Sequence, residues 1–475
     1  MMRKRGRSCV VALLAAVLAG CMVGPDYVRP VAPAPAEFKE AAGWKVAQPS
    51  DAAPRGEWWA VFNDADLDAL VAQVDISNQT VLAAEARVRE ALAATQASRA
   101  ALFPVVNANF AGVRSSRTTG TNATSSSGVA NSYNLGLTAS WEVDLWGGIR
   151  RGVEASSSSA QATAAELAGA RLSAQALLAQ DYLLLRVQDA QIALLRETVA
   201  TFERSLQLTR NQYAAGIVAR GDVAQAEAQL KSTQAQVMDA MLVRAQLEHA
   251  IAVLVGKPPS ELAIAPKPLA TVFPDIPVEV PSALLERRPD IAAAERRTAS
   301  ANAQIGVAQA AFFPALTLSA SGGVQSSVIG SLLSLPSRYW AVGGSIAQAV
   351  FDAGLRSAQK EQAIAVYDET VANYRATVLG GFQDVEDNLA ALALLAQEAA
   401  LQDEAVKAAQ QSAAIAINQY KAGTASYLAV VVLQATALSS ERTALSIHGR
   451  RLTASVGLIK ALGGGWNADA LDATY

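Results

Sequence analysis

The chain carries one long pattern twice, and this repeat limits the folds available to it more than any other feature. The letters QYAAG at 212–216 recur as QYKAG at 419–423, so the two tyrosines lie 207 residues apart. Phe-Pro at 103–104 recurs as Phe-Pro at 313–314. Solenoid units repeat every 20–50 residues or so. A much longer period therefore indicates a duplicated domain.

Each half predicts the same order of elements: a helix, two strands joined by a polar loop, a very long helix, a tight turn and a further helix. The expected helices span about 65–101, 148–213 and 221–256 in the first half, and about 282–310, 355–420 and 426–462 in the second. Seven prolines between 257 and 281 exclude a helix there. The resulting division is a first repeat at 65–256, a Pro-rich linker at 257–281, a second repeat at 282–463 and a C-terminal tail at 464–475.

The N-terminus has the pattern of an export signal. Residues 1–20 join a basic start to an apolar core that is shorter than the roughly 20 residues a spanning helix needs. The letters LAGC at 18–21 resemble a bacterial lipobox, which implies that Cys21 carries lipid and begins an extended N-terminal segment at 21–64. Met22 in place of an aspartate implies delivery to the outer membrane.

Two segments in each half have the two-residue periodicity of strands. From Tyr133 to Leu145 every second residue is apolar, and those between are polar or small. Between 298 and 351 only Arg338 is charged, which favours lipid contact over the alternative of a soluble hairpin packed on helices. Four strands cannot close a barrel, and an open edge in lipid leaves backbone groups unpaired. Membrane-embedded strands therefore require an oligomer that pools them.

The long helices carry an apolar heptad. Apolar residues recur every seven positions from Leu178 to Tyr213, and the positions 207 residues later, from Val385 to Tyr420, are also apolar. Such a stripe predicts coiled-coil packing. With a rise of about 1.5 Å per residue, the helix at 148–213 is roughly 100 Å long. That length fits a reach across the space below an outer membrane.

Charge and motif content argue against other functions. Lys plus Arg total 39 and Asp plus Glu total 42, and this net charge of −3 gives no reason to expect nucleic acid as a partner. The only cysteines, Cys9 and Cys21, exclude a cysteine metal site. With no nucleophile–base pair, metal cluster or phosphate loop, we expect no enzyme and no cofactor beyond the lipid on Cys21. Glu386 and Asp387 are interpreted as solvated helix residues.

Four motifs place the chain beside a known family. These are GPDY at 24–27, SWEVDLWG at 140–147, LLERRPDI at 284–291 and KALGGGW at 460–466. The motifs occur in this order and together with the repeat. In this combination, the chain resembles the TolC-like outer-membrane factors, and within them the NodT-type lipoproteins that serve resistance–nodulation–division (RND) pumps. The resemblance covers nearly all of the mature chain.

The resemblance implies a mixed α/β membrane protein that forms a homotrimer. The chains would pool four strands each in a transmembrane β-barrel and continue into the periplasm as a long α-helical coiled-coil barrel. It implies a passive outer-membrane duct for drugs or other small toxic compounds. Its partners would be an inner-membrane RND transporter, a periplasmic adaptor protein and outer-membrane lipid.

The turns after the long helices are expected to form the periplasmic tips. Gly216 follows Tyr213, and Gly423 follows Tyr420. Glycine supplies the left-handed backbone that a tight reversal needs. In the family, charged residues just after these turns form ion pairs and carboxylate rings that hold the tips together.

The two turns differ in charge. Arg220 and Asp222 follow the first turn and are candidates for a latch whose loss lets the helices separate. The alternative is that Asp222 is only a helix N-cap. After the second turn, residues 425–440 are uncharged where the best-known family pattern has an arginine and two aspartates. Our hypothesis is that Tyr427, Leu428 and Val431 close this tip by apolar contact that excludes water.

Two other functions remain open at this point. An outer-membrane duct for protein secretion shares the architecture, and the lipid cysteine and the terminal Gly-Gly-Gly-Trp favour the pump-linked branch by analogy alone. A lipid-anchored coiled-coil scaffold without a pore explains the helices but not the charge-free hairpins.

Overall fold

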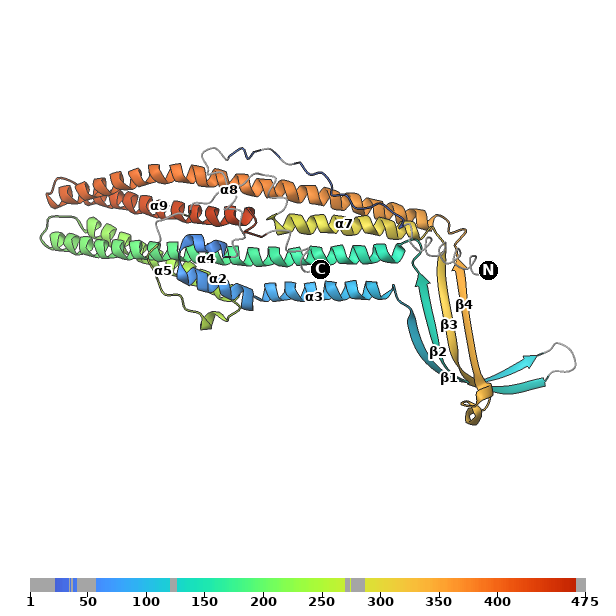
Figure 1. Ribbon diagram of the computed structural model, residues 1–475. Coiled ribbons are helices and arrows are strands. Elements are labelled where there is room, and N and C mark those ends of the chain that lie inside the picture. The colour runs from blue at the N-terminus through green and yellow to red at the C-terminus, as the bar shows by residue number, and fades with distance from the viewer. Residues whose placement is uncertain are drawn as a thin grey trace.

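The fold is known from a computed structural model. It describes residues 22–33, 35, 37–40, 57–119, 126–269, 274 and 287–466. Figure 1 shows a long helical bundle with a four-stranded sheet at one end. The turns that join each long helix to the next helix lie at the other end.

The first half contains α2 (Ala65–Ser77), α3 (Gln79–Ala100), β1 (Val105–Thr119), β2 (Ser126–Val143), α4 (Gly148–Ala214) and α5 (Arg220–Leu254). The second half contains α7 (Pro289–Ala310), β3 (Ala315–Ser326), β4 (Arg338–Ala347), α8 (Leu355–Lys421) and α9 (Tyr427–Ala461). The helices have matched lengths: α4 and α8 have 67 residues each, α5 and α9 have 35, and α3 and α7 have 22.

The long helices and the helices that follow them lie close to their expected bounds. The helix expected at 282–310 is described from Pro289, and 282–286 lie outside the described residues. Proline is favoured at the start of a helix, because the N–H group that proline lacks would have no partner within the helix at that position. The C-terminal tail expected at 464–475 is described only as far as Trp466.

The single helix expected at 65–101 is wrong, because the structure breaks it at Asn78. The side-chain oxygen of Asn78 accepts hydrogen bonds from the backbone nitrogens of Thr80 and Val81, at 2.9 and 3.1 Å. Its amide group donates to the carbonyl of Leu254 at 2.8 Å. Asparagine is a preferred N-cap, so one side chain ends α2, begins α3 and ties both to the end of α5.

The four strands form one antiparallel sheet in the order β1-β2-β3-β4. The register places Phe110, Leu318 and Val342 on the same face as the apolar residues of β2. The opposite face carries polar or small residues such as Thr138 and Ser321, which lie opposite each other. The expected alternation of an apolar and a polar face is therefore present over most of the sheet; Val105 and Val113 of β1 lie on the polar face and Arg114 lies on the apolar one.

Two details of the sheet differ from expectation. β2 ends at Val143, two residues before the expected Leu145, whose amide donates back to the Val143 carbonyl. The second hairpin lacks the expected polar loop and has two short 3-10 helices, η5 (Ile329–Ser331) and η6 (Leu335–Ser337), with Leu333 exposed between them. Serine hydroxyls donate to the Val328 and Ser331 carbonyls of this loop, and Leu332 is its one buried leucine.

Among the described residues, none of the helices combines the length and the apolar character that crossing a membrane requires. Apart from the exposed Tyr213, the residues of the apolar heptads face the interior of the bundle. Leu178 and Leu185 of α4 and Val385 of α8 are fully buried. α4 packs on α5 and α8 packs on α9, as coiled packing predicts.

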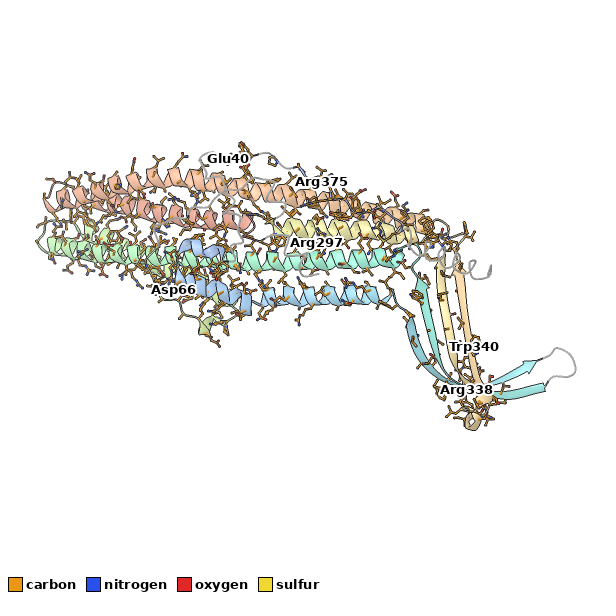
Figure 2. All side chains as sticks on the ribbon, viewed as in Figure 1. Glu40, Asp66, Arg297, Arg338, Trp340 and Arg375 are labelled. Carbon is orange, nitrogen blue, oxygen red and sulfur yellow. The ribbon has the colours of Figure 1, made fainter. Side chains whose placement is uncertain are left out.

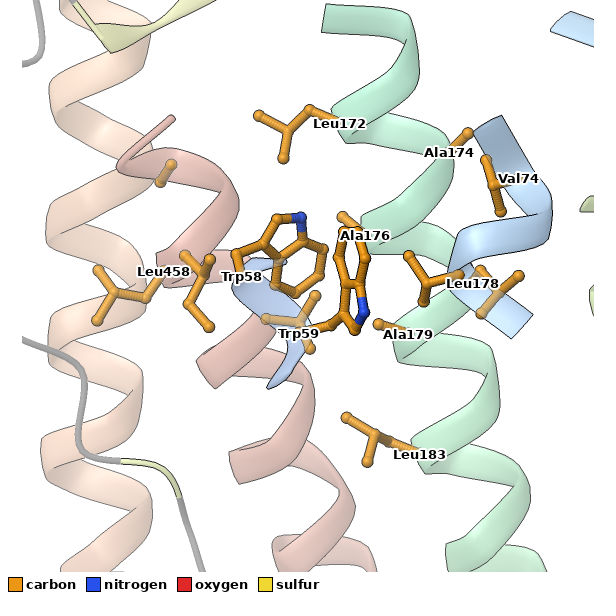
Figure 3. Packing of buried hydrophobic residues seen from close by; sticks show 14 of the residues in the cluster. Trp58, Trp59, Val74, Leu172, Ala174, Ala176, Leu178, Ala179, Leu183 and Leu458 are labelled. Atoms are coloured by element: carbon orange, nitrogen blue, oxygen red, sulfur yellow. The ribbon is translucent and has the colours of Figure 1, made fainter. Parts of the chain in front are cut away.

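The largest apolar core lies in the middle of the bundle. Here the short helix η2 (Trp58–Phe62) and α2 pack on α4 and α9. The rings of Trp58 and Trp59 meet edge to face with centroids 5.7 Å apart, and Figure 3 shows them between α4 and Leu458 of α9. The indole nitrogen of Trp58 donates to Gln175 at 3.3 Å, so the buried polar group is satisfied.

Candidate functional site

The two turns at the far end of the helices have the same backbone. Gly216 and Gly423 have φ angles of 72° and 73°. In the first turn the amide of Ile217 donates to the carbonyl of Gln212 at 2.9 Å, and the second turn repeats this bond. Both helices thus end in a left-handed glycine cap. A Cβ at either glycine would meet nothing within 4 Å, so glycine is needed for its backbone angle and not for space.

Tyr213 and Tyr420 end the two long helices but differ in burial. Tyr420 is 7% exposed, and its ring centroid lies 5.3 Å from that of Tyr427. Its hydroxyl donates to Gln212 Oε1 at 2.5 Å, across to the first hairpin. Tyr213 is 47% exposed and has no side-chain hydrogen bond to the described residues of its own chain.

An apolar cluster joins the two hairpins near the turns, and we call it the tip cluster. Its buried members are Phe202, Leu206, Ala226, Leu230, Ala416, Tyr420, Tyr427, Val430 and Val431. They come from α4, α5, α8 and α9. Apolar burial therefore holds both hairpins of one chain together at the tip.

The structure corrects the apolar-closure hypothesis for two of its three residues. Tyr427 and Val431 are buried in the tip cluster of their own chain, so they do not face outward. Leu428 is 59% exposed, and Val432 is also largely exposed. Residues four positions apart share a helix face. Leu428 and Val432 therefore present one apolar face outside the chain, which we call the tip face.

Asp222 does not cap α5, because Ala219 occupies the N-cap position and no side-chain cap bond is present. Asp222 lies in the first turn of the helix, where the helix dipole favours a carboxylate. The charge of Asp222 also raises the pKa of Tyr427. Burial, and then the negative charges of Tyr420 and Asp222, raise the pKa of the Tyr427 phenol to about 12.

Arg220 is exposed at the start of α5 and forms no ion pair with the described residues of the single chain. The ion pair near this turn joins Arg210 of α4 to Glu227 of α5. The latch expected from Arg220 and Asp222 is therefore not present within one chain. It stays a prediction that requires a residue of another chain.

The lipidation expected on Cys21 falls just outside the described residues. The described residues between 22 and 40 form an extended segment that we call the N-terminal strap. Its carbonyl at Val31 accepts a hydrogen bond from Arg375 Nε at 3.2 Å. Figure 2 shows Glu40 and Arg375 along the same side of α8. The strap therefore runs back along the helices from the point where the lipid is expected.

The strap covers a buried arginine near the sheet. Arg151 of α4 donates to Asp26, to Glu154 and to the Val23 carbonyl, at 2.7, 2.8 and 3.3 Å. Gly306 of α7 leaves room for this side chain, since a Cβ there would lie 2.8 Å from it. The start of the strap thus completes the packing between α4 and α7.

Two carboxylates hold the rest of the strap. The Tyr27 hydroxyl donates to Glu295 Oε1 at 2.6 Å, and burial together with this carboxylate raises the pKa of Tyr27. The backbone nitrogens of Lys39 and Glu40 donate to the two oxygens of Glu386 at 2.7 and 2.9 Å. The interpretation of Glu386 as a merely solvated helix residue is therefore wrong.

Sequence reasoning missed Arg151, Glu295 and Glu386 as residues that bind the strap. Asp26 and Tyr27 belong to the GPDY motif at 24–27, one of the four motifs of the family resemblance. Each of these two side chains bonds a charged residue more than 100 positions away. The motif was therefore the one available signal for this site.

Comparison with known proteins agrees with this architecture. The family model "Outer membrane efflux protein" matches residues 70–257 and 280–464. The pyoverdine export outer membrane protein OpmQ of Pseudomonas aeruginosa is 32% identical, over 95% of this chain and 96% of that protein. The toluene efflux pump outer membrane protein TtgC of Pseudomonas putida is 31% identical, over 96% and 95%. The solved structure of the outer-membrane channel OprN superposes with a TM-score of 0.88 at 31% identity, over 94% of this chain and all of that one (100%).

These similarities cover both halves of the chain and nearly the whole length of each relative. The relatives named here are outer-membrane proteins of export systems, and the solved structure is a channel. The chain therefore belongs to the outer membrane efflux protein family and is an outer-membrane efflux channel.

Proposed function

We propose that three copies of this chain form the outer-membrane duct of a tripartite efflux pump, anchored by lipid on Cys21. An inner-membrane RND transporter and a periplasmic adaptor protein would deliver the cargo, and the duct itself is passive. The proposed cargo is small organic compounds, a class that includes the pyoverdine and toluene of the relatives' names.

One observation carries the proposal: the four-stranded sheet has an apolar face and two unpaired outer strands. β1 and β4 are the edges of this sheet. Edge strands in lipid must pair, because no water is there to bond the free backbone groups. Three copies would pool twelve strands, within the range of known membrane barrels. The polar and small residues of the other face would then line the lumen.

The matched halves support a closed ring below the sheet. We interpret the equal lengths of corresponding helices in the two halves as the result of a gene duplication. Three chains would then supply six similar units. The long helices of 67 residues each would extend roughly 100 Å into the periplasm. This reach brings the tips toward an adaptor and an inner-membrane pump.

We place the gate at the tips. The tip cluster joins the two hairpins of one chain, so opening separates chains rather than hairpins. The tip face of Leu428 and Val432 is the exposed apolar surface beside the second turn. Three such faces would close the narrow end by excluding water, in place of the carboxylate ring that the family pattern predicts.

The test is planar-bilayer conductance of the purified, acylated protein beside a Leu428→Ser variant. Small discrete steps are expected for the wild type and larger steps for Leu428→Ser, because a hydroxyl in the constriction holds water. The matched control is Ile217→Ser, since Ile217 is an exposed apolar residue of the first turn. Its steps should equal those of the wild type.

Each other outcome changes the proposal. Steps of equal size in all three proteins would keep the pore and move the gate away from the tip face. Protein that is oligomeric and inserted but gives no steps would overturn the duct and favour the lipid-anchored scaffold.

A further inference from the structure

The apolar face of the sheet carries two charged side chains near the end that points away from the helices. Arg114 of β1 lies on this face, because it pairs with Asn131, four positions before Leu135 on β2. Arg338 of β4 lies on the same face, because its partner Val324 also pairs with Leu135. We call Arg114 and Arg338 the rim arginines.

Both rim arginines are exposed, and neither forms an ion pair or a side-chain hydrogen bond with another described residue. The sequence around them explains this. Residues 100–141 and 298–351 contain three arginines, at 114, 117 and 338, and no aspartate or glutamate. Further copies of the chain would therefore add no acid to these strands or to the loops that join them. An anionic partner for the rim arginines has to come from outside the protein.

The opposite end of the sheet, beside the helices, has paired charges. Asp144 pairs with Arg150 where β2 leads into α4, and Asp352 pairs with Arg356 where β4 leads into α8. Both acids also accept hydrogen bonds from backbone nitrogens near the helix starts. Charged groups are costly within the apolar layer of a membrane. These pairs therefore mark the inner edge of the embedded part of the sheet.

The height of the rim arginines above this edge matches the apolar thickness of a membrane. Arg114 lies nine positions beyond Val105, the first residue of β1. Val324, the partner of Arg338, lies nine positions beyond Ala315, the first residue of β3. Nine residues span about 30 Å along a strand, or about 23 Å in height at the usual tilt of a barrel strand. The lipid-facing band of such barrels is about 25 Å tall, so the arginines reach the outer layer of headgroups.

Aromatic side chains on the same face support this level. Trp340 lies two positions from Arg338 and is 81% exposed, and Figure 2 shows both residues at the end of the sheet that is far from the helices. Tyr133 lies two positions from Asn131, the partner of Arg114. Tryptophan and tyrosine are enriched where the apolar layer meets the headgroups. Each rim arginine thus has an aromatic residue between itself and the apolar layer.

We propose that the rim arginines bind phosphate groups of anionic lipids in the outer leaflet of the membrane. This inference rests on the proposed duct, because it requires an embedded sheet whose apolar face is turned toward lipid. A guanidinium presents parallel N–H donors that match two oxygens of one phosphate. The apolar side chains below each arginine would contact the acyl chains of the same lipid.

The absence of acids near the rim arginines in the sequence selects the class of lipid. A zwitterionic headgroup brings its own ammonium group, which would find no carboxylate among residues 100–141 and 298–351. A headgroup that carries phosphates and no cation has no such cost. The rim arginines also lie on β1 and β4, the two outer strands of the sheet, so the phosphates that they bind are several strand spacings apart. The ligand class is therefore a phosphorylated glycolipid of the lipid A type.

The experiment is lipid titration of the purified, acylated protein in detergent, with bound lipid counted by native mass spectrometry. The probe is lipid A with two phosphates. The comparison lipids are the same lipid A after removal of both phosphates, which keeps the acyl chains, and phosphatidylethanolamine. The wild type is expected to reach half-saturation with the phosphorylated probe at a concentration at least tenfold lower than with either comparison lipid.

The decisive variant is Arg114→Gln with Arg338→Gln, which removes both charges and keeps polar side chains. It should raise the half-saturating concentration of lipid A at least tenfold and leave that of the dephosphorylated lipid unchanged. Replacement of both arginines by lysine keeps the charge but loses the two parallel donors, so a smaller, severalfold rise is expected. The matched control is Arg450→Gln, which removes an exposed cation of the helical bundle that pairs with Glu398. It should bind lipid A as the wild type does.

Three results would overturn the inference. The first is equal binding of lipid A and its dephosphorylated form, because acyl chains alone would then explain the retention. The second is an equal loss in the rim variant and in Arg450→Gln. The third is displacement of lipid A by an equal concentration of inorganic phosphate, which would make this a site for the free anion. Failure of the proposed function is separate: inserted protein that prefers lipid A but gives no bilayer conductance would remove the duct and keep the headgroup site.

Discussion

Arg151 and Asp26 are joined by a 2.7 Å hydrogen-bonded ion pair across 125 residues of sequence. The Arg151 side chain is 1% exposed, whereas that of Asp26 is 89% exposed. The strap therefore brings an accessible carboxylate to a cation that the helices have already enclosed. A buried cation needs such a partner, because leaving it unpaired is costly in free energy.

Replacement of Asp26 by alanine should destabilise the protein by about 1–2 kcal/mol. Glu154 stays within 2.8 Å of Arg151, so the loss is partial. The measurement is denaturant unfolding of the detergent-solubilised protein. Asp387→Ala is the control, since Asp387 lies exposed on α8 and its loss should change stability by less than about 0.5 kcal/mol. Equal stability of both variants would contradict the role of the strap.

Glu386→Gln should loosen the far end of the strap. The glutamine keeps one acceptor oxygen but turns an amide N–H₂ toward one of the two backbone nitrogens that Glu386 now binds. Trypsin cleavage after Lys39 should become severalfold faster, because proteases cut chain that opens locally. Glu398→Gln, on the exposed part of the same helix, should leave the cleavage rate unchanged. A rate that does not respond to Glu386→Gln would refute the clamp.

Asp189 is expected to contribute more to stability than any exposed carboxylate. It accepts hydrogen bonds from Arg186 at 2.9 Å and Arg244 at 2.6 Å, and both arginines also donate to carbonyls of the linker at 257–281. Asp189→Ala leaves the buried Arg186 and the half-buried Arg244 without their shared carboxylate, at a cost of about 3–5 kcal/mol. Chemical unfolding measures this loss. Glu398→Ala, which breaks an exposed ion pair, should cost less than about 1 kcal/mol.

The helices were predictable because their signals are local. The heptad and the glycines at 216 and 423 mark the long helices and their ends without reference to the rest of the chain. The break at Asn78 was not predictable in this way. Its cap bonds are local, but its side chain also binds Leu254, at the end of a helix 176 positions away.

The site was only partly predictable for the same reason. Tyr213 and Tyr420 occur in nearly identical sequence, yet one is exposed and the other buried. The difference arises because the second hairpin packs on the first within the chain. The residues next to each tyrosine in the sequence do not indicate this packing. Glu386 likewise has the local sequence of a surface acid. Its role depends on a hydrogen bond from a residue 346 positions earlier in the sequence.

The last prediction concerns the pH dependence of the tip. Burial, and then Tyr420 and Asp222, raise the pKa of Tyr427 to about 12, against a smaller lowering by the neighbouring Thr209. The unfolded chain releases the same proton near pH 10. Because the folded-state pKa is the higher one, the contribution of Tyr427 to stability is complete below about pH 10 and is lost as the pH rises through 12. The packing of the tip cluster should therefore become less stable between about pH 10 and pH 12.

An alkaline absorbance titration tests this assignment when the curve of Tyr427→Phe is subtracted from that of the wild type. The difference curve should have its midpoint near pH 12. In an Asp222→Asn background the midpoint should fall, because one negative charge beside the phenol is gone. Glu227→Gln is the matched control: it also removes a carboxylate from α5, but this carboxylate pairs with Arg210. A midpoint that moves equally in both backgrounds would mean that Asp222 does not face Tyr427.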